Sequence, residues 1–254
     1  MGSFIPQEFE DVVLKASTIG RELYDLDKVS AIANDVLLET VQDLPGWLLG
    51  GYLPMREGAE EGRVNDSFFV YFYTSESPPR IAYMARVNPH AKPTLEAFSP
   101  PRACDLALAE LVRARQVALA EMPALGQPVN LIPLPVDASG ESGTLVYLLA
   151  GTTKSNVVVF GQHFRALVPP SGSGATSMTA LSHSALELPT RQSNGEAPVA
   201  LMLTHVVTDY PMETHVFNSL LARLPLYVGT RRGVWYVDGD AISLISGPPS
   251  VGLA

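Results

Sequence analysis

The spacing of the apolar residues changes near Pro45-Gly46, and this change is the strongest indication of the fold class. Before it, apolar side chains recur every three to four residues, which is the spacing that gives an α-helix one buried face. After it, most apolar segments are short, alternate with polar residues and are bounded by Gly, Pro, Asn or Asp, as in antiparallel strands. The chain therefore predicts an α+β protein in which helices come first and sheets follow.

Helices are predicted in three parts of the chain. Two amphipathic helices occupy the N-terminus, because apolar residues repeat with helical spacing over 8–23 and again over 27–44. The run Tyr24-Asp25-Leu26-Asp27 separates them, with Asp27 as a suitable N-cap, and Pro45-Gly46 ends the second helix. One central helix and one short C-terminal helix are predicted at Ala103–Met122 and Glu213–Arg223.

The remaining elements are predicted as strands that pair mainly in antiparallel sheets built from hairpins. Asp238-Gly239 is a strong hairpin turn. We expect one compact domain over 1–254, and we leave open a division into two lobes, 1–125 with helices and a hairpin and 126–254 with a β-rich body and a C-terminal meander. The predicted strands are Trp47–Leu53, Phe68–Thr74, Arg80–Val87, Thr94–Phe98, Val129–Leu134, Thr144–Ala150, Asn156–Val168, Met178–Leu188, Pro198–Val207, Pro225–Thr230, Gly233–Val237 and Ala241–Ser246.

Composition excludes several classes of protein. No apolar run approaches the roughly 18 residues that a bilayer-spanning helix needs, and Cys104 is the single cysteine, which rules out an internal disulfide. A pI near 5.0 disfavours a nucleic-acid partner, because phosphate backbones require a basic surface. The sequence contains no phosphate-binding loop and no nucleophile elbow. We therefore expect a soluble, cytoplasmic protein with no cofactor, no metal, no membrane partner and no nucleic-acid partner.

Negative charge is concentrated in the first quarter of the chain. Residues 1–66 carry 13 acidic and 5 basic side chains, whereas residues 67–254 carry 13 and 12. A segregated acidic surface can steer a basic protein partner, and the alternative is that these carboxylates are the solvated faces of helices. The sequence carries no expectation of oligomeric state. The candidate partner-binding residues on the first helix are Glu8, Glu10, Asp11 and Glu22.

The densest group of reactive side chains is His205-x3-Asp209-x3-Glu213-x-His215. Two histidines and a carboxylate commonly hold a single metal ion, and the same residue types perform acid–base catalysis. The histidines are ten residues apart, however, with Pro211 between them, so they meet only if the turn folds back. The structural alternative assigns Asp209 to the turn and Glu213 to the start of a helix, where carboxylates are favoured.

His163 and Arg165 form a second candidate site, for an anion or a carboxylate. In a strand their side chains share one face, so they form a small polar stripe if Phe164 points inward. If Phe164 points outward, His163 is instead a core histidine bonded to the backbone. Gly161, two residues earlier, is also compatible with a β-bulge.

Two functional hypotheses of different class remain. The first is a non-enzymatic binding protein, such as an adaptor, chaperone or toxin-neutralising protein, that presents its acidic N-terminal helical face to a basic partner protein. The second is a hydrolase or metal-dependent enzyme that uses His205, Asp209, Glu213 and His215. The separation of the two imidazoles discriminates between them, because metal ligands lie about 2 Å from the ion.

Overall fold

The computed structural model describes residues 4–44, 49–58, 66–135, 143–170, 176–182, 184–192 and 195–247. Over these residues the chain is an α+β protein with three α-helices, three four-stranded sheets and one two-stranded pair. All strand pairs are antiparallel except one, so the predicted fold class is confirmed. No helix in the described part of the chain is long and apolar enough to cross a membrane.

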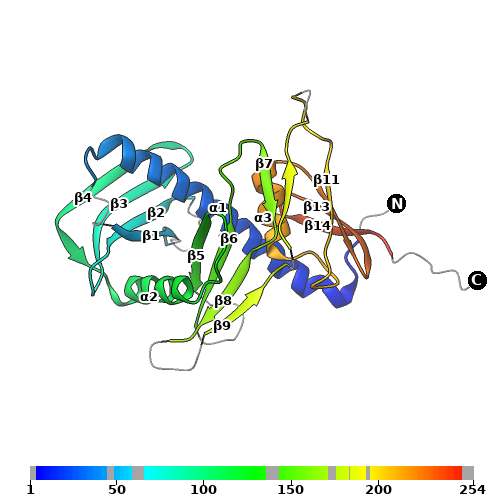
Figure 1. Cartoon of the computed structure of the whole chain (residues 1–254), viewed down its shortest axis with the longest axis horizontal. Helices are drawn as coiled ribbons and strands as arrows, with labels where there is room; N and C mark the ends of the chain where they lie inside the picture. Colours follow the sequence, from blue (N-terminus) through cyan, green and yellow to red (C-terminus); the bar gives the residue numbers. More distant parts are fainter. Residues whose placement is uncertain are drawn as a thin grey trace, which may run out of the picture.

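The N-terminal helix α1 (Glu10–Thr40) is continuous over 31 residues, and the prediction of two helices is wrong. The segment around Asp25 contains neither Pro nor Gly, and the buried stripe continues through it from Leu23 to Leu26 and Val29. At 1.5 Å per residue the helix is about 46 Å long, and it runs along most of the molecule (Figure 1). The short 3-10 helix Gln7–Phe9 precedes it.

The first sheet lies between the C-terminal half of α1 and the helix α2 (Leu106–Ala120). Alternate residues of its second strand face the two helices: Phe72 packs in the core that includes α1, and Tyr73 packs in the core that includes α2. The fourth strand, predicted as the short Thr94–Phe98, extends over 13 residues. In sheet order the strands are β1 (Leu49–Arg56), β2 (Phe68–Thr74), β3 (Arg80–Asn88) and β4 (Ala91–Ala103).

Helix α2 begins later than predicted because Asp105 caps it. The Asp105 carboxylate accepts a hydrogen bond from the Leu108 backbone N–H at 2.8 Å. Cys104 therefore precedes the helix, where its thiol donates to the Pro79 carbonyl at 3.4 Å. Trp47, in the predicted strand Trp47–Leu53, and the predicted helix end at Pro45-Gly46 lie outside the described residues, as do residues 59–65.

The middle sheet corrects two strand predictions. Asn156–Val168 is two strands, because Gly161 and Gln162 have φ of 105° and 52° and break the extended backbone. A Cβ at Gly161 would lie 1.8 Å from the Ser184 carbonyl oxygen, so only glycine fits there. Met178–Leu188 is likewise two short strands. The sheet order is β5 (Val129–Pro135), β6 (Thr144–Ala150), β8 (Phe164–Val168) and β9 (Ser177–Ala180), and the separate pair is β7 (Val157–Phe160) with β10 (Leu186–Pro189).

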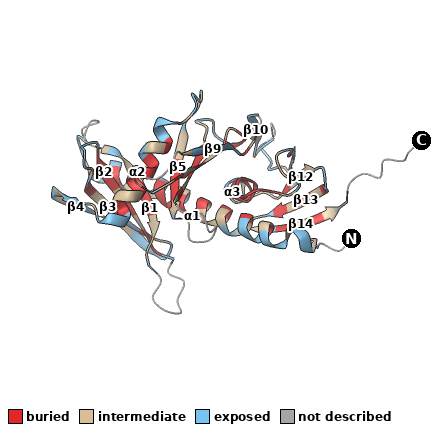
Figure 2. Ribbon diagram, turned by 90° about the horizontal axis from the view of Figure 1, so that it is seen from below, coloured by how far each residue is buried: buried red, intermediate tan, exposed pale blue. Residues whose placement is uncertain are grey.

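The C-terminal sheet contains the predicted three-stranded meander, which is confirmed. Its fourth strand is shorter than the predicted Pro198–Val207 and runs parallel to its neighbour, with α3 (Glu213–Ala222) as the crossover. Helix α3 is buried through its first seven residues (Figure 2). The sheet order is β11 (Leu201–Thr204), β12 (Leu226–Thr230), β13 (Gly233–Asp238) and β14 (Ala241–Ser246).

Helix α1 connects the separate hydrophobic cores. Its first turns, with Val13 and Ala16, pack in the core of the C-terminal sheet, and its later turns pack against the first and middle sheets. Gly20 allows α1 and α3 to cross closely, because a Cβ there would lie 2.5 Å from the Glu213 carbonyl oxygen and the Val216 side chain. The junction of α1, α3 and the middle sheet is therefore the place where all parts of the molecule meet.

Candidate functional site

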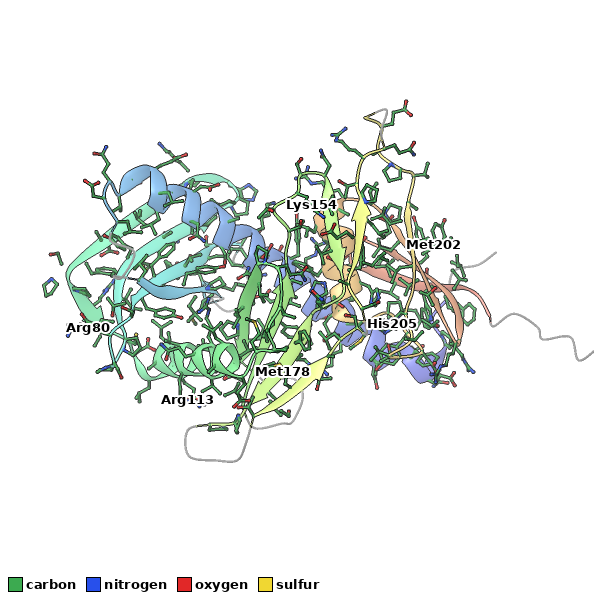
Figure 3. The ribbon with its side chains drawn as sticks, in the orientation of Figure 1. Arg80, Arg113, Lys154, Met178, Met202 and His205 are labelled. Atoms are coloured by element: carbon green, nitrogen blue, oxygen red, sulfur yellow. The ribbon has the colours of Figure 1, made fainter. Side chains whose placement is uncertain are left out.

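The turn between β11 and α3 does fold back, and it brings the two histidines of the predicted cluster together. His205 follows β11 (Figure 3), and its ring meets that of His215 edge to face, with the centroids 4.6 Å apart. Asp209 does not join them: it is exposed, and its backbone carbonyl accepts a hydrogen bond from the Trp235 indole at 3.0 Å. Over the described residues, no group of three His, Cys, Asp or Glu side chains could hold a metal ion.

Both imidazoles are occupied by local backbone contacts. Nε2 of His205 accepts a hydrogen bond from the Thr208 backbone N–H at 3.2 Å and also contacts the Thr208 hydroxyl. Nδ1 of His215 accepts from the Met212 backbone N–H at 3.0 Å, which satisfies a donor at the start of α3. Burial, assisted by His205, lowers the pKa of His215 to about 3, so this imidazole is neutral near pH 7.

Glu213 links the two candidate sites. It is 5% exposed, and its Oε1 accepts hydrogen bonds from the Tyr147 hydroxyl at 2.9 Å and from the Arg165 guanidinium at 3.0 Å. Burial and the nearby Glu213 charge raise the pKa of Tyr147 well above its usual value. The three side chains therefore join the middle sheet to the first turn of α3, and Arg165 is engaged by a protein carboxylate.

His163 occupies the break between β7 and β8 and does not share a strand face with Arg165. It is 1% exposed, its Nδ1 accepts from the Ala150 backbone N–H at 3.0 Å, and its Nε2 faces the Val159 carbonyl at 3.2 Å. Burial lowers its pKa to about 4. These contacts match the core-histidine alternative, and the polar stripe does not form.

The four acidic candidates on the N-terminal segment divide into two groups. Glu8 pairs with Arg232, and Glu22 pairs with Arg56 at 2.6 Å, so part of the acidic surface is neutralised within the molecule. Glu10 and Asp11 are exposed and make no ion pair with any other described residue.

A cavity of about 320 Å³ lies at the junction of α1, β1, β5, the end of β6 and α3, and sequence reasoning missed it. We call it the Asp27 cavity. Apolar side chains of Leu149, Phe217 and Leu221 form part of its wall. Its polar lining residues are Asp27, Ser30, Asn34, Tyr52, Asn130 and Thr152.

Asp27 is held at the end of a short chain of hydrogen bonds. The Tyr52 hydroxyl donates to Oδ1 of Asn130 at 2.6 Å, and the Asn130 amide donates to Oδ1 of Asp27 at 2.5 Å. Burial raises the pKa of the Asp27 carboxyl, although the hydrogen bond from Asn130 opposes this rise. Oδ2 of Asp27 receives no hydrogen bond from any described residue. The half-buried carboxylate therefore keeps one oxygen without a protein donor.

Ser30 and Asn34, which also line the Asp27 cavity, each donate a hydrogen bond to a backbone carbonyl. The Ser30 hydroxyl donates to the Leu26 carbonyl at 2.7 Å, and the Asn34 amide donates to the Ser30 carbonyl at 2.8 Å. Their oxygen lone pairs remain as acceptors. Together with Asp27 they give the cavity an excess of acceptors and one negative charge. This favours a ligand that carries several donors and a positive charge.

The signal for this site is present in the sequence. Asp27, Ser30 and Asn34 are spaced by three and four residues and so lie on one helical face, beside the apolar stripe. This polar group is recognised only when α1 is treated as one helix, because a helix break before Asp27 makes that residue an N-cap.

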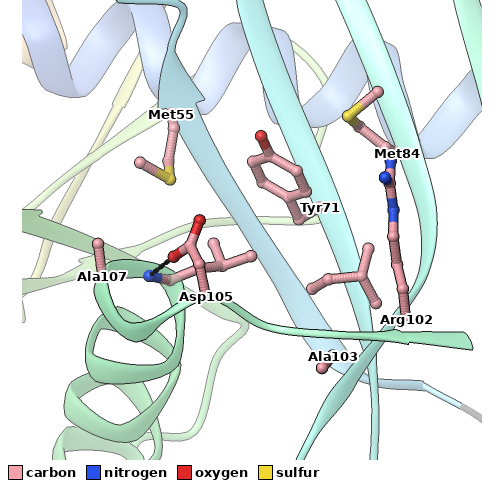
Figure 4. A pocket seen from close by; sticks show the side chains of 9 residues that line it. Met55, Tyr71, Met84, Arg102, Ala103, Asp105 and Ala107 are labelled. Atoms are coloured by element: carbon pink, nitrogen blue, oxygen red, sulfur yellow. Dashed lines mark hydrogen bonds between the residues drawn. The ribbon is translucent and has the colours of Figure 1, made fainter.

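A further cavity of about 280 Å³ lies between the first sheet and the start of α2 (Figure 4). Its walls are mainly apolar, with Met55, Tyr71 and Met84 from the sheet. Its two charged side chains are already engaged, since Asp105 caps α2 and the Arg102 guanidinium lies 3.6 Å from the centroid of the Phe98 ring. Both charged groups of this cavity therefore already have partners within the protein.

Comparisons of the chain with models of protein families, with curated proteins and with solved structures find no match.

Proposed function

We propose that this chain is a non-enzymatic binding protein for a basic partner protein, and that an ammonium or guanidinium group of the partner enters the Asp27 cavity. The observation that carries the proposal is the Asp27 carboxylate, which is half-buried in the cavity wall and has one oxygen without a protein donor. A positive donor at this oxygen forms a charge-assisted hydrogen bond and offsets the cost of burying the charge.

The size and lining of the cavity support a side chain as ligand. Its volume of about 320 Å³ is at the lower end of the usual range for ligand sites, roughly 300–1,000 Å³. Leu149 and Phe217 can pack against the methylene groups of a lysine or arginine, while Ser30 and Asn34 offer acceptors near the charged end. The Arg115 guanidinium lies 5.6 Å from the centroid of the Tyr52 ring, but Arg115 does not line the cavity. It therefore does not take the place of the ligand's positive charge.

The acidic residues of α1 assist this proposal at longer range. Glu10, Asp11, Asp35 and Glu39 are exposed on the helix that carries Asp27. They create a negative potential along α1, which raises the encounter rate with a basic protein at low ionic strength. Glu39 lies in the last turn of α1, where a negative charge interacts unfavourably with the helix dipole and where no basic residue offsets it. Helix stability therefore does not explain the presence of this carboxylate.

The enzyme hypothesis stays a prediction without comparable support. The histidines meet, but His205 and His215 each use a nitrogen for a backbone donor, and Glu213 is held by Tyr147 and Arg165.

Calorimetric titration at pH 7 with n-butylamine and n-butylguanidine tests the proposal, with butyrate as an anionic control. We expect both cations to bind with dissociation constants of about 1 mM and butyrate not to bind. Asp27→Asn keeps an acceptor for Asn130 but removes the charge, so it is expected to weaken binding at least ~10-fold. Asp35→Asn, an exposed change of the same kind on the same helix, should leave binding unchanged. Equal binding by both variants would show that Asp27 is not the site.

A further inference from the structure

Two side-chain oxygens of the Asp27 cavity receive no hydrogen bond from any described residue. They are Oδ2 of Asp27 and Oδ1 of Asn34, and both residues line the cavity from one face of α1. Neither oxygen is among the buried side-chain atoms without a partner in the described part of the chain, so both are open to solvent. The cavity therefore offers a ligand two accessible acceptors, of which one belongs to a carboxylate.

The other carboxylate oxygen of Asp27 already holds a donor. Nδ2 of Asn130 donates to Oδ1 of Asp27 at 2.5 Å, and Oδ1 of Asn130 accepts from the Tyr52 hydroxyl at 2.6 Å. The Asn130 side chain makes no other hydrogen bond to the residues that the structure describes. An ionised carboxylate only accepts hydrogen bonds, so the amide nitrogen must face Asp27, and the Tyr52 hydroxyl satisfies the amide oxygen in that orientation. The carboxylate thus presents one open oxygen and one that is engaged.

We infer that the Asp27 cavity prefers the ammonium group of a lysine side chain to the guanidinium group of an arginine, and that Asn130 sets this preference. This inference rests on the proposed function, because it specifies which basic group of the partner enters the site. Asn130 acts by occupying Oδ1 of Asp27, and Tyr52 holds the Asn130 amide in the orientation that does so. The preference therefore depends on the packing of β1 and β5 against α1.

The two cationic groups differ in how they use a carboxylate. A guanidinium is bound most strongly when two parallel N–H groups reach both carboxylate oxygens. At Asp27, one of these N–H groups would have to share Oδ1 with the Asn130 amide or displace it. An ammonium is a compact charge with three donors in different directions. It needs only Oδ2 of Asp27, and it keeps donors for an acceptor such as Oδ1 of Asn34.

NMR titration of the 15N-labelled protein with n-butylamine and with n-butylguanidine measures the preference, with the backbone amide of Asp27 as reporter. We expect the wild-type protein to bind n-butylamine about 5-fold more tightly, which is the usual worth of one hydrogen bond. Asn130→Val suits a strand and frees Oδ1 of Asp27, so n-butylguanidine should gain about 5-fold and the preference should disappear. Both probes are compared in the same variant, so a change in the ionisation of Asp27 cancels from the ratio.

Asn88 in β3 provides the matched control. Like Asn130 it is half-buried, and its amide donates one hydrogen bond, to Ser67, and accepts another, from the His90 backbone N–H. It does not line the Asp27 cavity, so Asn88→Val should keep the preference of the wild-type protein. Cooperative unfolding in urea establishes that each variant is folded. If Asn130→Val does not unfold cooperatively, Asn130→Ala removes the same donor and takes its place.

The outcomes distinguish this inference from the function on which it rests. If n-butylguanidine binds the wild-type protein as tightly as n-butylamine or more tightly, the inferred preference is overturned and the Asp27 site stands. The same holds if the preference survives in the folded Asn130 variant. If neither probe binds the wild-type protein, both the preference and the proposed function are overturned.

Discussion

Oε1 of Glu213 accepts a hydrogen bond from Arg165 at 3.0 Å, although 48 positions separate the two residues. The contact joins side chains that sequence patterns place in two unrelated candidate sites. With the Tyr147 hydroxyl on the same oxygen, it fastens the first turn of α3 to the middle sheet. The carboxylate that was a candidate for catalysis thus contributes to the assembly of the fold.

Removing the charge of Glu213 should destabilise the protein. Glu213→Gln leaves the Arg165 guanidinium without its carboxylate in a half-buried position, so we expect the free energy of unfolding to fall by about 2 kcal/mol. Urea denaturation followed by circular dichroism measures this change. Glu187→Gln removes the exposed pair with Lys154 and should cost under ~0.5 kcal/mol. Equal losses in the two variants would contradict a structural role for Glu213.

The two buried, neutral histidines predict a loss of stability in mild acid. The pKa values of His163 and His215 are about 4 and about 3, against 6.5 for an ordinary histidine. Below pH 6.5 the unfolded chain therefore binds protons that the native state does not, and stability falls as pH falls from about 6.5 toward 4. We expect on the order of 1 kcal/mol per pH unit for each histidine.

Urea titrations at several pH values between 7.5 and 4.5 test the acid sensitivity. Removing either buried histidine should flatten the slope of stability against pH, provided that the variant still unfolds cooperatively. The exposed His90 is the control, because His90→Gln should leave that slope unchanged. A slope that is independent of His163 and His215 would mean that neither is held neutral.

The Asp27 carboxyl predicts the opposite dependence on pH. Burial raises its pKa in the native state, so its contribution to stability is largest when it is protonated and is lost as pH rises through the native-state pKa. Asp27→Asn should therefore match or exceed the wild-type midpoint of thermal unfolding at pH 7, and the difference should shrink at pH 3. A variant that is less stable than the wild type at pH 7 would show that the charge is stabilised by the protein itself.

Zinc should have no effect on the stability of the chain. His205 and His215 each accept a backbone hydrogen bond through one ring nitrogen, and Asp209 lies apart from them. We expect the midpoint of thermal unfolding to change by less than ~1 °C when excess zinc or a chelator is added, since a metal that binds only the native state stabilises it. A large rise with zinc that is lost in His215→Asn would restore the metal-enzyme hypothesis.

The sequence predicted those parts of the fold that local chemistry controls. The C-terminal meander follows from alternation and from Asp238-Gly239, where Gly239 has a φ of 59°. Strand β6 was predicted with its observed ends because an uninterrupted apolar run fills Thr144–Ala150. Where local signals compete with tertiary contacts, prediction failed: Asp27 looked like a cap, yet the buried stripe continues through α1.

The candidate site was less predictable because its parts come from distant segments. The Asp27 cavity combines α1 with Tyr52, Asn130 and the end of β6, and pairwise spacing in the sequence does not reveal which of these meet. The split at Gly161 depends on the approach of Ser184, a contact that alternation does not contain. The sequence left the meeting of His205 and His215 conditional on the turn folding back, and their contact and hydrogen bonds were visible only in the structure.

The pKa of the Asp27 carboxyl, followed by its 13C chemical shift during a pH titration with and without n-butylamine, tests the central claim most directly. Binding of a cation beside the carboxylate favours the charged form, so the amine should lower the pKa of Asp27. The same pKa for Asp27 with and without saturating amine would contradict the account.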